Sequence, residues 1–404
     1  MNILTAEYLV TFDDEFKIYK DKAIAYDKTI KMIATKEELL KKFPDAKVKE
    51  CGKNSVILPG LINTHIHLEY LANKTSLEYG EFVKWLKTVL KHQQTLMASC
   101  SDEKIDNVLN KLLKSGTTTI GEISSFGLDI KSCKASKINV VLFNEVLGSS
   151  PDGVDMMYQN FLQRYQTTLS LKNDRFIPAI SIHSPYSTHP ILAKKVLLLA
   201  KEDDTLVATH FMESKAEREW LDSGKGEFKE FLKSFNPYAK PLVSSMEFLK
   251  LFYGVDTLFI HATFANDEEL EYINSHDYFI TSCPVSNRVL ENAKLDISKV
   301  KNLTIATDGL TSNISLNLWN ELRHTLFIHE NIDIDKLSKK LLNSVTKDAG
   351  VALKLNKGVL KEGYDADMIV VKLPDSFEEL ESIYKWLILH IKEAYLTIIQ
   401  GEEI

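Results

Sequence analysis

The sequence predicts an α/β protein in which a (β/α)8 TIM barrel carries a small, discontinuous β-sandwich domain formed by both chain ends. Three observations predict this fold. Eight apolar runs follow one another through the middle of the chain, helix-periodic segments separate them, and short alternating strands occupy both flanks. The expected domain boundaries are residues 1–55 and 350–404 for the composite sandwich and residues 56–349 for the barrel.

The eight apolar runs are the expected barrel strands, because each is bounded by turn signals. In chain order they read VILPGLINTHIHL, TTTIGEIS, NVVLFNEV, FIPAISIH, TLVATHF, TLFIHAT, YFITSCP and LTIATDG. Helical periodicity is clear in segments between them, such as DEKIDNVLNKLLKSG before the second run, ILAKKVLLLAKEDD after the fourth and NDEELEYINSH after the sixth. Strands that alternate with helices are typical of a barrel whose chemistry lies at the carboxyl ends of its strands.

The two flanks have a different pattern from the centre. Short alternating segments read ILTAEYLVTF and KAIAYDKTIKMIAT near the start and GYDADMIVVK and EAYLTIIQG near the end. Neither flank can bury much surface by itself, so we expect the two to pack together. Between the fifth and sixth barrel strands, residues 212–255 form the longest interruption, and we expect a lid or binding loop there.

Composition restricts the class of function. Of 404 residues, 44% are hydrophobic and 26% charged, which is the balance of a globular chain and not of a disordered one. The 49 basic and 56 acidic residues give a formal net charge of −7, and no block of like charge is long enough for a nucleic-acid or membrane arm. We therefore expect a small-molecule substrate, with no nucleic-acid or membrane partner.

Cysteine usage and the apolar segments indicate the compartment. The four cysteines are too irregularly spaced for a metal knuckle or a disulfide ladder: Cys51, Cys100, Cys133 and Cys283. The N-terminal segment lacks the basic region of a signal peptide, and no apolar stretch approaches 18 uncharged residues. A cytoplasmic location is expected.

The first apolar run contains the strongest chemical signal, His65 and His67 in PGLINTHIHLEY. Side chains two residues apart in a strand lie on the same face, so both imidazoles can reach one ion. Imidazole is a common ligand for zinc or iron. By itself the pair is equally well explained by a structural role.

Three further strands end in groups of the same chemistry. The fifth run gives His210, with Glu213 three residues later, the sixth gives His261 and the eighth gives Asp308. The catalytic groups of a barrel lie at these strand ends. Four separate strands end in such a group, which a purely structural role for each residue would explain only by coincidence. The sequence therefore predicts a metal-dependent active site.

These motifs, together with CPVSN at 283–287, TDG at 307–309 and the closing GVLKEGYDADMIVV, resemble the amidohydrolase superfamily over nearly the whole chain. The pattern is most similar to the aminohydrolase branch that includes chlorotriazine hydrolases, adenosine and S-adenosylhomocysteine deaminases and guanine deaminase. Within it, the chain resembles the epsilon-proteobacterial aminofutalosine deaminases of the futalosine route to menaquinone. The resemblance implies a hydrolytic deaminase that releases ammonia from an amino-purine nucleoside.

The resemblance also implies roles for the strand-end residues. One divalent metal ion, zinc in the first place with iron or manganese as alternatives, would be held by four ligands: His65, His67, His210 and Asp308. Such a set leaves a position for water and lowers its pKa toward neutrality. Asp308 would accept the proton of this water, His261 would steer the attack, and Glu213 would protonate a ring nitrogen. A single ion is expected because the fourth run lacks the lysine that bridges two metals in other members.

Candidate substrate contacts are less well determined. His183, in a segment similar to the family's pocket-lining HxPY, is expected to contact the substrate, whereas nearby His189 is expected to start a helix. Trp85, on the helix after the first strand, is expected to stack on the substrate or contact its ribose. Equally, it can belong to the apolar face of that helix and have only a packing role. The nucleoside-binding relatives have a carboxylate near the end of this helix, where the chain has Gln93, so Glu145 is the alternative ribose contact.

The benzoate of aminofutalosine calls for a cation in the outer pocket. Arg288 after CPVSN is the candidate, although an arginine at the rim of a barrel more often forms a surface pair. Cys283 is expected to pack and not to act as a nucleophile. Three alternatives stay open: deamination of adenosine, methylthioadenosine or S-adenosylhomocysteine; a triazine or guanine-type reaction; and, disfavoured by the complete ligand set, a non-enzymatic scaffold. The default assembly is a homodimer.

Overall fold

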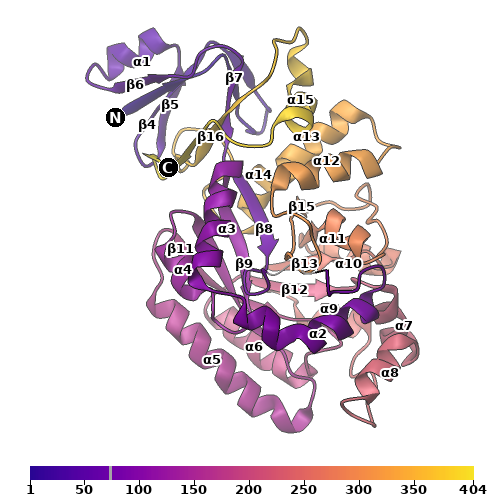
Figure 1. The fold of residues 1–404 in the computed structure, drawn as a ribbon. Coiled ribbons are helices and arrows are strands. Elements are labelled where there is room, and N and C mark those ends of the chain that lie inside the picture. Colours follow the sequence, from indigo (N-terminus) through magenta and orange to yellow (C-terminus); the bar gives the residue numbers. More distant parts are fainter. Residues whose placement is uncertain (72–74) are drawn as a thin grey trace.

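The computed structural model describes residues 1–71 and 75–404, and its centre is a nearly closed barrel of eight parallel strands (Figure 1). The strands are paired in chain order from β8 to β15. Their bounds are β8 Leu61–Ile66, β9 Thr117–Ser124, β10 Asn139–Val146, β11 Phe176–Ile182, β12 Val207–Phe211, β13 Thr257–His261, β14 Phe279–Ser282 and β15 Leu303–Ile305. All eight predicted barrel strands are present, and the predicted fold class is confirmed.

Hydrogen bonds across the seam hold the first and last strands of the barrel together. Thr64 Oγ1 on β8 donates to Thr304 Oγ1 on β15 at 3.0 Å. Just beyond β15, the backbone N–H of Asp308 donates to the carbonyl of His65 at 3.2 Å. This last bond places a predicted carboxylate ligand directly beside the two predicted histidine ligands of β8.

The first predicted strand is in fact two strands. Residues Ser55–Pro59 form β7, which belongs to an outer sheet, and β8 begins only after Gly60. Gly60 passes so close to β9 that a Cβ atom on it would lie 2.2 Å from the Thr118 side chain. One continuous apolar run therefore belongs to two sheets. Hydropathy does not mark the crossing, because both strands are buried.

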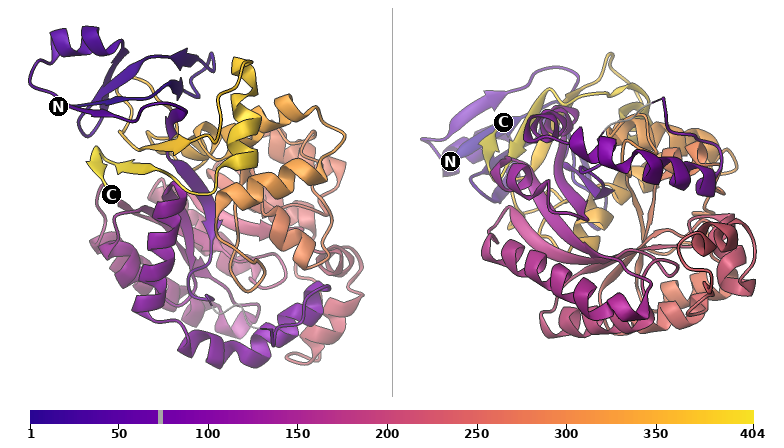
Figure 2. Two further views of the ribbon diagram at one scale, coloured as in Figure 1. Left: turned by 45° about the horizontal axis from the view of Figure 1, so that its top comes forward. Right: turned by 60° about the horizontal axis from the view of Figure 1, so that its bottom comes forward.

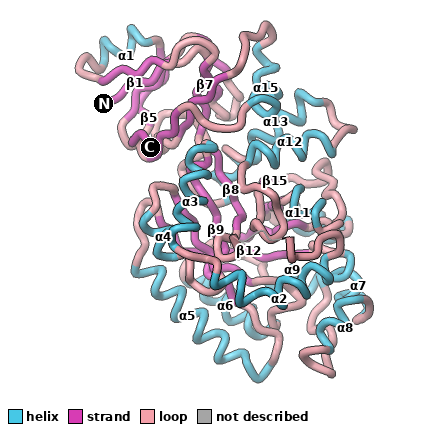
Figure 3. The backbone as a smooth tube through the Cα atoms, in the orientation of Figure 1, coloured by secondary structure: helices cyan, strands magenta, loops and turns pink. Residues whose placement is uncertain are grey.

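Helices cover the outside of the barrel (Figure 3, cyan around magenta). The predicted helical segments at 102–116, 191–204 and 266–276 appear as α3, α6 and α10. The helices are α1 Lys36–Lys42, α2 Phe82–Ala98, α3 Asp102–Ser115, α4 Ile130–Ala135, α5 Val154–Ser170, α6 Pro190–Glu202, α7 Lys215–Ser223, α8 Glu227–Lys233, α9 Ser245–Leu251, α10 Asp267–Ser275, α11 Pro284–Val289, α12 Leu318–Ile328, α13 Ile334–Ser344, α14 Lys347–Ala352 and α15 Ile383–His390, with 3-10 turns at Pro151–Gly153 and Leu380–Ser382.

Local signals explain where several of these helices begin. His189 is the N-cap of α6, and its ring nitrogen accepts the N–H of Ile191 at 3.2 Å, so its predicted helix-entry role is confirmed. Ser101 caps α3 in the same way, and Gly116 ends it in a left-handed conformation with φ of +93°. No helix in the described part of the chain combines the length and the apolar character that a membrane span requires.

The two chain ends form two further sheets beside the barrel (Figure 2). One sheet has the strand order β5-β4-β1-β6 and the other β18-β17-β16-β7-β2-β3. The strands are β1 Asn2–Thr5, β2 Tyr8–Val10, β3 Ile18–Lys20, β4 Ala23–Tyr26, β5 Ile30–Ala34, β6 Lys47–Glu50, β16 Met368–Lys372, β17 Leu396–Ile399 and β18 Glu402–Glu403. Leu4 and Ile24 of the first sheet share one buried cluster with Met368 and Ile398 of the second. Both flanks thus bury their apolar faces together, as expected.

The interruption at 212–255 is largely helical and not an irregular loop. It contains α7, α8 and α9, and Phe228 and Phe231 bury one face of α8. The Phe228 ring lies 6.0 Å from the ring of Phe82 on α2 and 4.5 Å from that of Tyr186. Figure 1 places α2 at the end of the barrel toward which β8 points, so α2 and α8 meet at the carboxyl ends of the strands.

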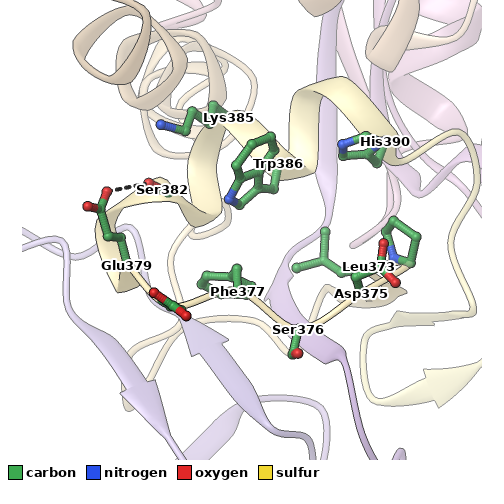
Figure 4. Close-up of a pocket in the computed structure, with 11 residues that line it drawn as sticks. Leu373, Asp375, Ser376, Phe377, Glu379, Ser382, Lys385, Trp386 and His390 are labelled. Carbon is green, nitrogen blue, oxygen red and sulfur yellow. Dashed lines mark hydrogen bonds between the residues drawn. The ribbon is translucent and has the colours of Figure 1, made fainter.

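A cavity of about 490 Å³ lies elsewhere, between α15 and the segment before it (Figure 4). Trp386, Phe377 and His390 line it, together with Lys385, whose ammonium group pairs with Asp335. None of its lining residues is a predicted site residue. This cavity is therefore separate from the cluster of histidines at the ends of the barrel strands.

Candidate metal centre and active site

The structure brings the predicted ligands together at the carboxyl ends of β8, β12 and β15. His65 Nε2 lies 3.2 Å from His67 Nε2, and Asp308 Oδ1 lies 3.6 Å from the first nitrogen and 3.5 Å from the second. His210 completes the group, since its ring centroid is 5.0 Å from that of His65 and 5.6 Å from that of His67. A donor atom from His65 also lies within 4.8 Å of donors from His210 and His261.

This arrangement fits a divalent cation. His210 Nδ1 donates to the backbone carbonyl of His183 at 3.0 Å, which leaves the Nε2 lone pair free to bind a metal. The Nε2 atoms of His65 and His67 lie 3.2 Å apart, so one ring can donate to the other only if it carries its proton on Nε2. A cation bound between these nitrogens and the Asp308 carboxylate would take the place of that proton, since both rings would then offer a lone pair.

Burial favours the neutral form of His67 and His210, which is the form that metal binding requires. It lowers the pKa of His67 to about 4, with a further lowering by His65. It also lowers the pKa of His210 well below its usual value, and nearby His65 and His183 add to the effect. Burial alone would raise the pKa of Asp308, but the hydrogen bond from His65 and the neighbouring histidines hold it well below its usual range. The site thus combines neutral nitrogen donors with an ionised carboxylate.

Asp308 is held by several donors in a strained backbone conformation. Its Oδ2 accepts from the hydroxyls of Ser286 at 2.7 Å and Ser312 at 3.0 Å, and its Oδ1 accepts the N–H of Gly309 at 2.8 Å. Asp308 has φ of +59° and His261 has φ of +71°. Positive φ at non-glycine residues is uncommon and clusters at functional sites, where the surroundings enforce it. Gly309 is needed beside them, since a Cβ there would lie 3.0 Å from that of His67.

Glu213 and His261 face each other next to the ligands. His261 Nε2 lies 3.6 Å from Glu213 Oε1, and His261 Nδ1 donates to Asn287 Oδ1 at 2.9 Å. Burial raises the pKa of Glu213 well above its usual value, and the charges of Asp308 and Glu217 raise it further. Burial lowers the pKa of His261 to about 4. The raised pKa favours the protonated form of Glu213, which can give a proton, and the lowered pKa of His261 keeps its imidazole neutral at neutral pH.

Two of the predicted substrate contacts lie beside this centre. A nitrogen of His183 and an oxygen of Glu145 come within 4.8 Å of a nitrogen of His210. His183 Nδ1 is hydrogen-bonded to Ser187 Oγ at 2.6 Å, which directs the other ring nitrogen away from that hydroxyl. Glu145, near the end of β10, accepts from the hydroxyl of Ser125. Both residues thus lie next to the predicted metal ligand His210.

Trp85 lies on α2, and its Nε1 donates to the carbonyl of Thr311 at 2.9 Å, in the loop that follows Asp308. Its ring packs on Phe82 at 5.5 Å. The side chain therefore connects α2 to the loop after Asp308. This position is compatible with a substrate contact and also with a packing role on the apolar face of α2. Gln93, farther along α2, is hydrogen-bonded to the Tyr70 hydroxyl.

The structure does not bring Arg288 to the cluster. It lies in the last turn of α11 with an exposed side chain, and its nearest charged or titratable neighbour is His324 on α12. Among the described residues it makes neither a hydrogen bond nor an ion pair through its guanidinium group. Cys283 is fully buried in an apolar cluster with Ile260 and Ala306, so its predicted packing role is confirmed.

Several residues of the site escaped the sequence analysis. Ser286 is hydrogen-bonded to Asp308, and Asn287 is hydrogen-bonded to His261. Both lie in the CPVSN segment, and their position directly after a barrel strand could have indicated a role in the site. Tyr186 in HSPY is partly buried, and desolvation, followed by the charge of Glu213, raises the pKa of its hydroxyl well above its usual value. Ser312 lies four residues after Asp308 on an irregular loop, which carries no periodic pattern.

Comparison with known proteins agrees with this geometry. The amidohydrolase family matches residues 56–401. The aminodeoxyfutalosine deaminase of a Nitratiruptor species is 45% identical over 388 residues, which are 96% of each chain. The adenosine deaminase of Helicobacter pylori is 33% identical over 100% of this chain and 99% of its own.

Solved structures give the same result. The crystal structure of Helicobacter pylori aminofutalosine deaminase in complex with methylthio-coformycin superimposes with a TM-score of 0.94 at 32% identity, covering 100% of both chains. An atrazine chlorohydrolase of Arthrobacter aurescens shares the fold, with a TM-score of 0.83 at 18% identity over 100% of this chain and 95% of its own. By fold and by sequence the chain belongs to the amidohydrolase family.

Proposed function

We propose that the protein is a metal-dependent hydrolytic deaminase of an amino-purine nucleoside, with 6-amino-6-deoxyfutalosine as its substrate and a place in menaquinone synthesis by the futalosine route. The observation that carries the chemistry is the group of His65, His67 and Asp308, beside which His210 lies, next to a Glu213 carboxyl group whose pKa burial raises well above its usual value. The choice of nucleoside is supported by the relative that is 45% identical over 96% of both chains, an aminodeoxyfutalosine deaminase.

In this proposal His65, His67, His210 and Asp308 hold one divalent metal ion, zinc being favoured by the nitrogen-rich donor set. The ion, when bound, makes water nucleophilic at neutral pH. Asp308 accepts the proton of the attacking water, and His261, oriented by Asn287, steers the attack. Glu213 delivers its proton to a ring nitrogen, so the ring carbon that bears the amine becomes electrophilic. The proton that Asp308 has taken from the water then passes to the amine, which leaves as ammonia, and the hydroxyl group of the adduct returns a proton to Glu213 as the carbonyl forms.

A parallel assay of ammonia release tests the proposed function. Purified protein of known metal content is given aminofutalosine, adenosine, methylthioadenosine, S-adenosylhomocysteine, guanine and cytosine. We expect the highest kcat/KM on aminofutalosine, because its relatives at full chain length include deaminases with that name. A higher value on adenosine or methylthioadenosine would move the assignment to that nucleoside. Protein with one metal per chain that releases no ammonia from the whole panel would refute the purine assignment.

The benzoate contact proposed for Arg288 has its own test. Replacing Arg288 by alanine should raise KM for aminofutalosine severalfold and leave KM for adenosine unchanged, because only the first substrate carries the carboxylate. Steady-state kinetics on both nucleosides give the answer. The side chain is exposed and unpaired among the described residues, so its loss should not disturb the fold. Equal changes for both substrates would contradict the assignment.

Three further properties complete the proposal. Residues 1–55 and 350–404 act as one composite domain beside the barrel of residues 56–349, which is supported by the cluster that Leu4, Ile24 and Met368 share. The protein works in the cytoplasm, consistent with four cysteines that are all free. It forms a homodimer, which light scattering on the purified protein would test.

A further inference from the structure

The connection between β12 and α7 carries Glu213 in a sharp bend. β12 ends at Phe211 and α7 begins at Lys215, so only three residues lie between them. Met212 has φ of +50°, a left-handed conformation that a residue with a side chain adopts only when its surroundings hold it there. The direction of the Glu213 side chain depends on the groups that fix this bend.

Glu217, on the first turn of α7, supplies acceptors for the bend. Its Oε1 accepts the N–H of Met212 at 3.1 Å, and its Oε2 accepts the N–H of Glu213 at 2.9 Å. Its own backbone N–H donates to Ser214 Oγ at 3.1 Å, which caps the helix. The Glu217 side chain is fully buried. Two acceptor oxygens on consecutive N–H groups hold the backbone at both Met212 and Glu213.

The position of Glu217 is that of a capping-box glutamate, but its bonds are different. In a capping box, the glutamate three residues after the N-cap accepts the N–H of the N-cap residue itself. Glu247 does so for Ser244 at the start of α9, and Glu269 does so for Asn266 at the start of α10. Glu217 reaches past its N-cap to the two residues before it. The Glu217 side chain therefore stabilises the bend that carries Glu213, and not the first residue of its own helix.

A second group holds the other side of the same bend. Thr263 Oγ1 donates to the carbonyl of Glu213 at 2.7 Å, and the N–H of Phe264 donates to the carbonyl of Met212 at 2.9 Å. Thr263 follows His261 by two residues, and His261 Nε2 is 3.6 Å from Glu213 Oε1. Glu217 and Thr263 together therefore fix the acid relative to the imidazole beside it.

We propose that Glu217 is a positioning residue for the reaction: its carboxylate holds the backbone of Met212 and Glu213 so that the Glu213 carboxyl group stands where it can protonate the substrate ring. The inference rests on the proposed function, because it requires Glu213 to act as the acid. A glutamine at this position keeps the size and one acceptor, but turns an NH2 group toward one of the two N–H donors. That bond is lost, and the bend gains freedom.

The test compares Glu217→Gln with Glu269→Gln. Glu269 is a buried capping-box glutamate on a neighbouring helix that pairs with Arg218 and does not touch the bend. Glu217→Gln should lower kcat about 10- to 100-fold, since an ångström of misplacement is worth up to about 10²-fold, while KM and metal content stay within twofold. Glu269→Gln should lower Tm and retain kcat. Unchanged kcat in Glu217→Gln, or an equal loss in both variants, would overturn the proposal.

A second set of variants separates positioning from stability. Thr263→Val removes the hydroxyl at constant size and should lower kcat, whereas Thr263→Ser keeps the hydroxyl and should restore it. The loss in the Glu217→Gln/Thr263→Val double variant should be smaller than the product of the two single losses, because both hold one bend. A loss equal to the product would overturn this coupling. Where Glu217→Gln does not fold, Glu217→Asp replaces it, with the same expected split between kcat and KM.

The two proposals fail in different ways. Metal-loaded wild-type protein without activity on the nucleoside panel would contradict the proposed function. An active wild type whose Glu217→Gln and Glu217→Asp variants keep full kcat would overturn only the positioning role.

Discussion

Replacing Asp308 by asparagine should lower kcat by about four orders of magnitude, the upper end of the range for loss of a general base. The amide oxygen can still accept from the hydroxyls of Ser286 and Ser312, and the only one of these hydrogen bonds that is lost is that from the N–H of Gly309, which then faces the NH2 group. It has no negative charge, however, and its NH2 group cannot accept the proton of the attacking water. Steady-state ammonia release on aminofutalosine, with metal analysis of the same preparation, measures the effect.

A matched substitution shows whether the loss is local. Asp296 also accepts from a serine hydroxyl, that of Ser298, but it lies on the surface away from the strand ends. Asp296→Asn should keep wild-type kcat, and both variants should unfold within a few degrees of the wild type. Near-normal turnover in Asp308→Asn would refute its role as the proton acceptor. A large fall in Tm would instead make Asp308 a structural residue.

The barrel and its metal centre were predictable because strand order alone determines where they lie. Parallel strands bring their carboxyl ends to one face, so a histidine or aspartate at the end of an apolar run is placed without knowing any side-chain conformation. His65, His210, His261 and Asp308 all met this condition. The composite sandwich was predictable for a related reason, since neither flank had enough apolar residues to stand by itself.

What lay outside the strand ends could not be predicted in the same way. Arg288 and Asn287 are neighbours in sequence, but successive residues on α11 point in different directions, so one faces solvent and the other holds His261. Ser312 reaches Asp308 from an irregular loop, and Glu217 reaches the bend from a position that normally caps a helix. Each of these contacts depends on side-chain direction, which hydrophobic periodicity does not encode.

Replacing Glu213 by glutamine should lower kcat by about two to four orders of magnitude, the usual scale for loss of a general acid. The glutamine can donate a hydrogen bond to the ring nitrogen but cannot transfer a proton to it. Burial raises the pKa of Glu213 well above its usual value, so the carboxyl group keeps its proton to a higher pH than an exposed glutamate does and loses it as the pH rises through that raised pKa. The wild-type rate should therefore fall on the alkaline side, and the glutamine variant should lack this limb.

Glu219, on the exposed side of α7, provides the matched control for this variant. Glu219→Gln changes the same functional group on the helix that follows the bend, and it should keep both the wild-type rate and the alkaline limb. Because Glu213 is not among the expected metal ligands, Glu213→Gln should retain one metal ion per chain, which separates it from a defect in metal binding. An unchanged rate in Glu213→Gln would mean that another group protonates the ring. Tyr186 would then be the next candidate, since it lies partly buried near position 213 and desolvation raises the pKa of its hydroxyl, which keeps it protonated.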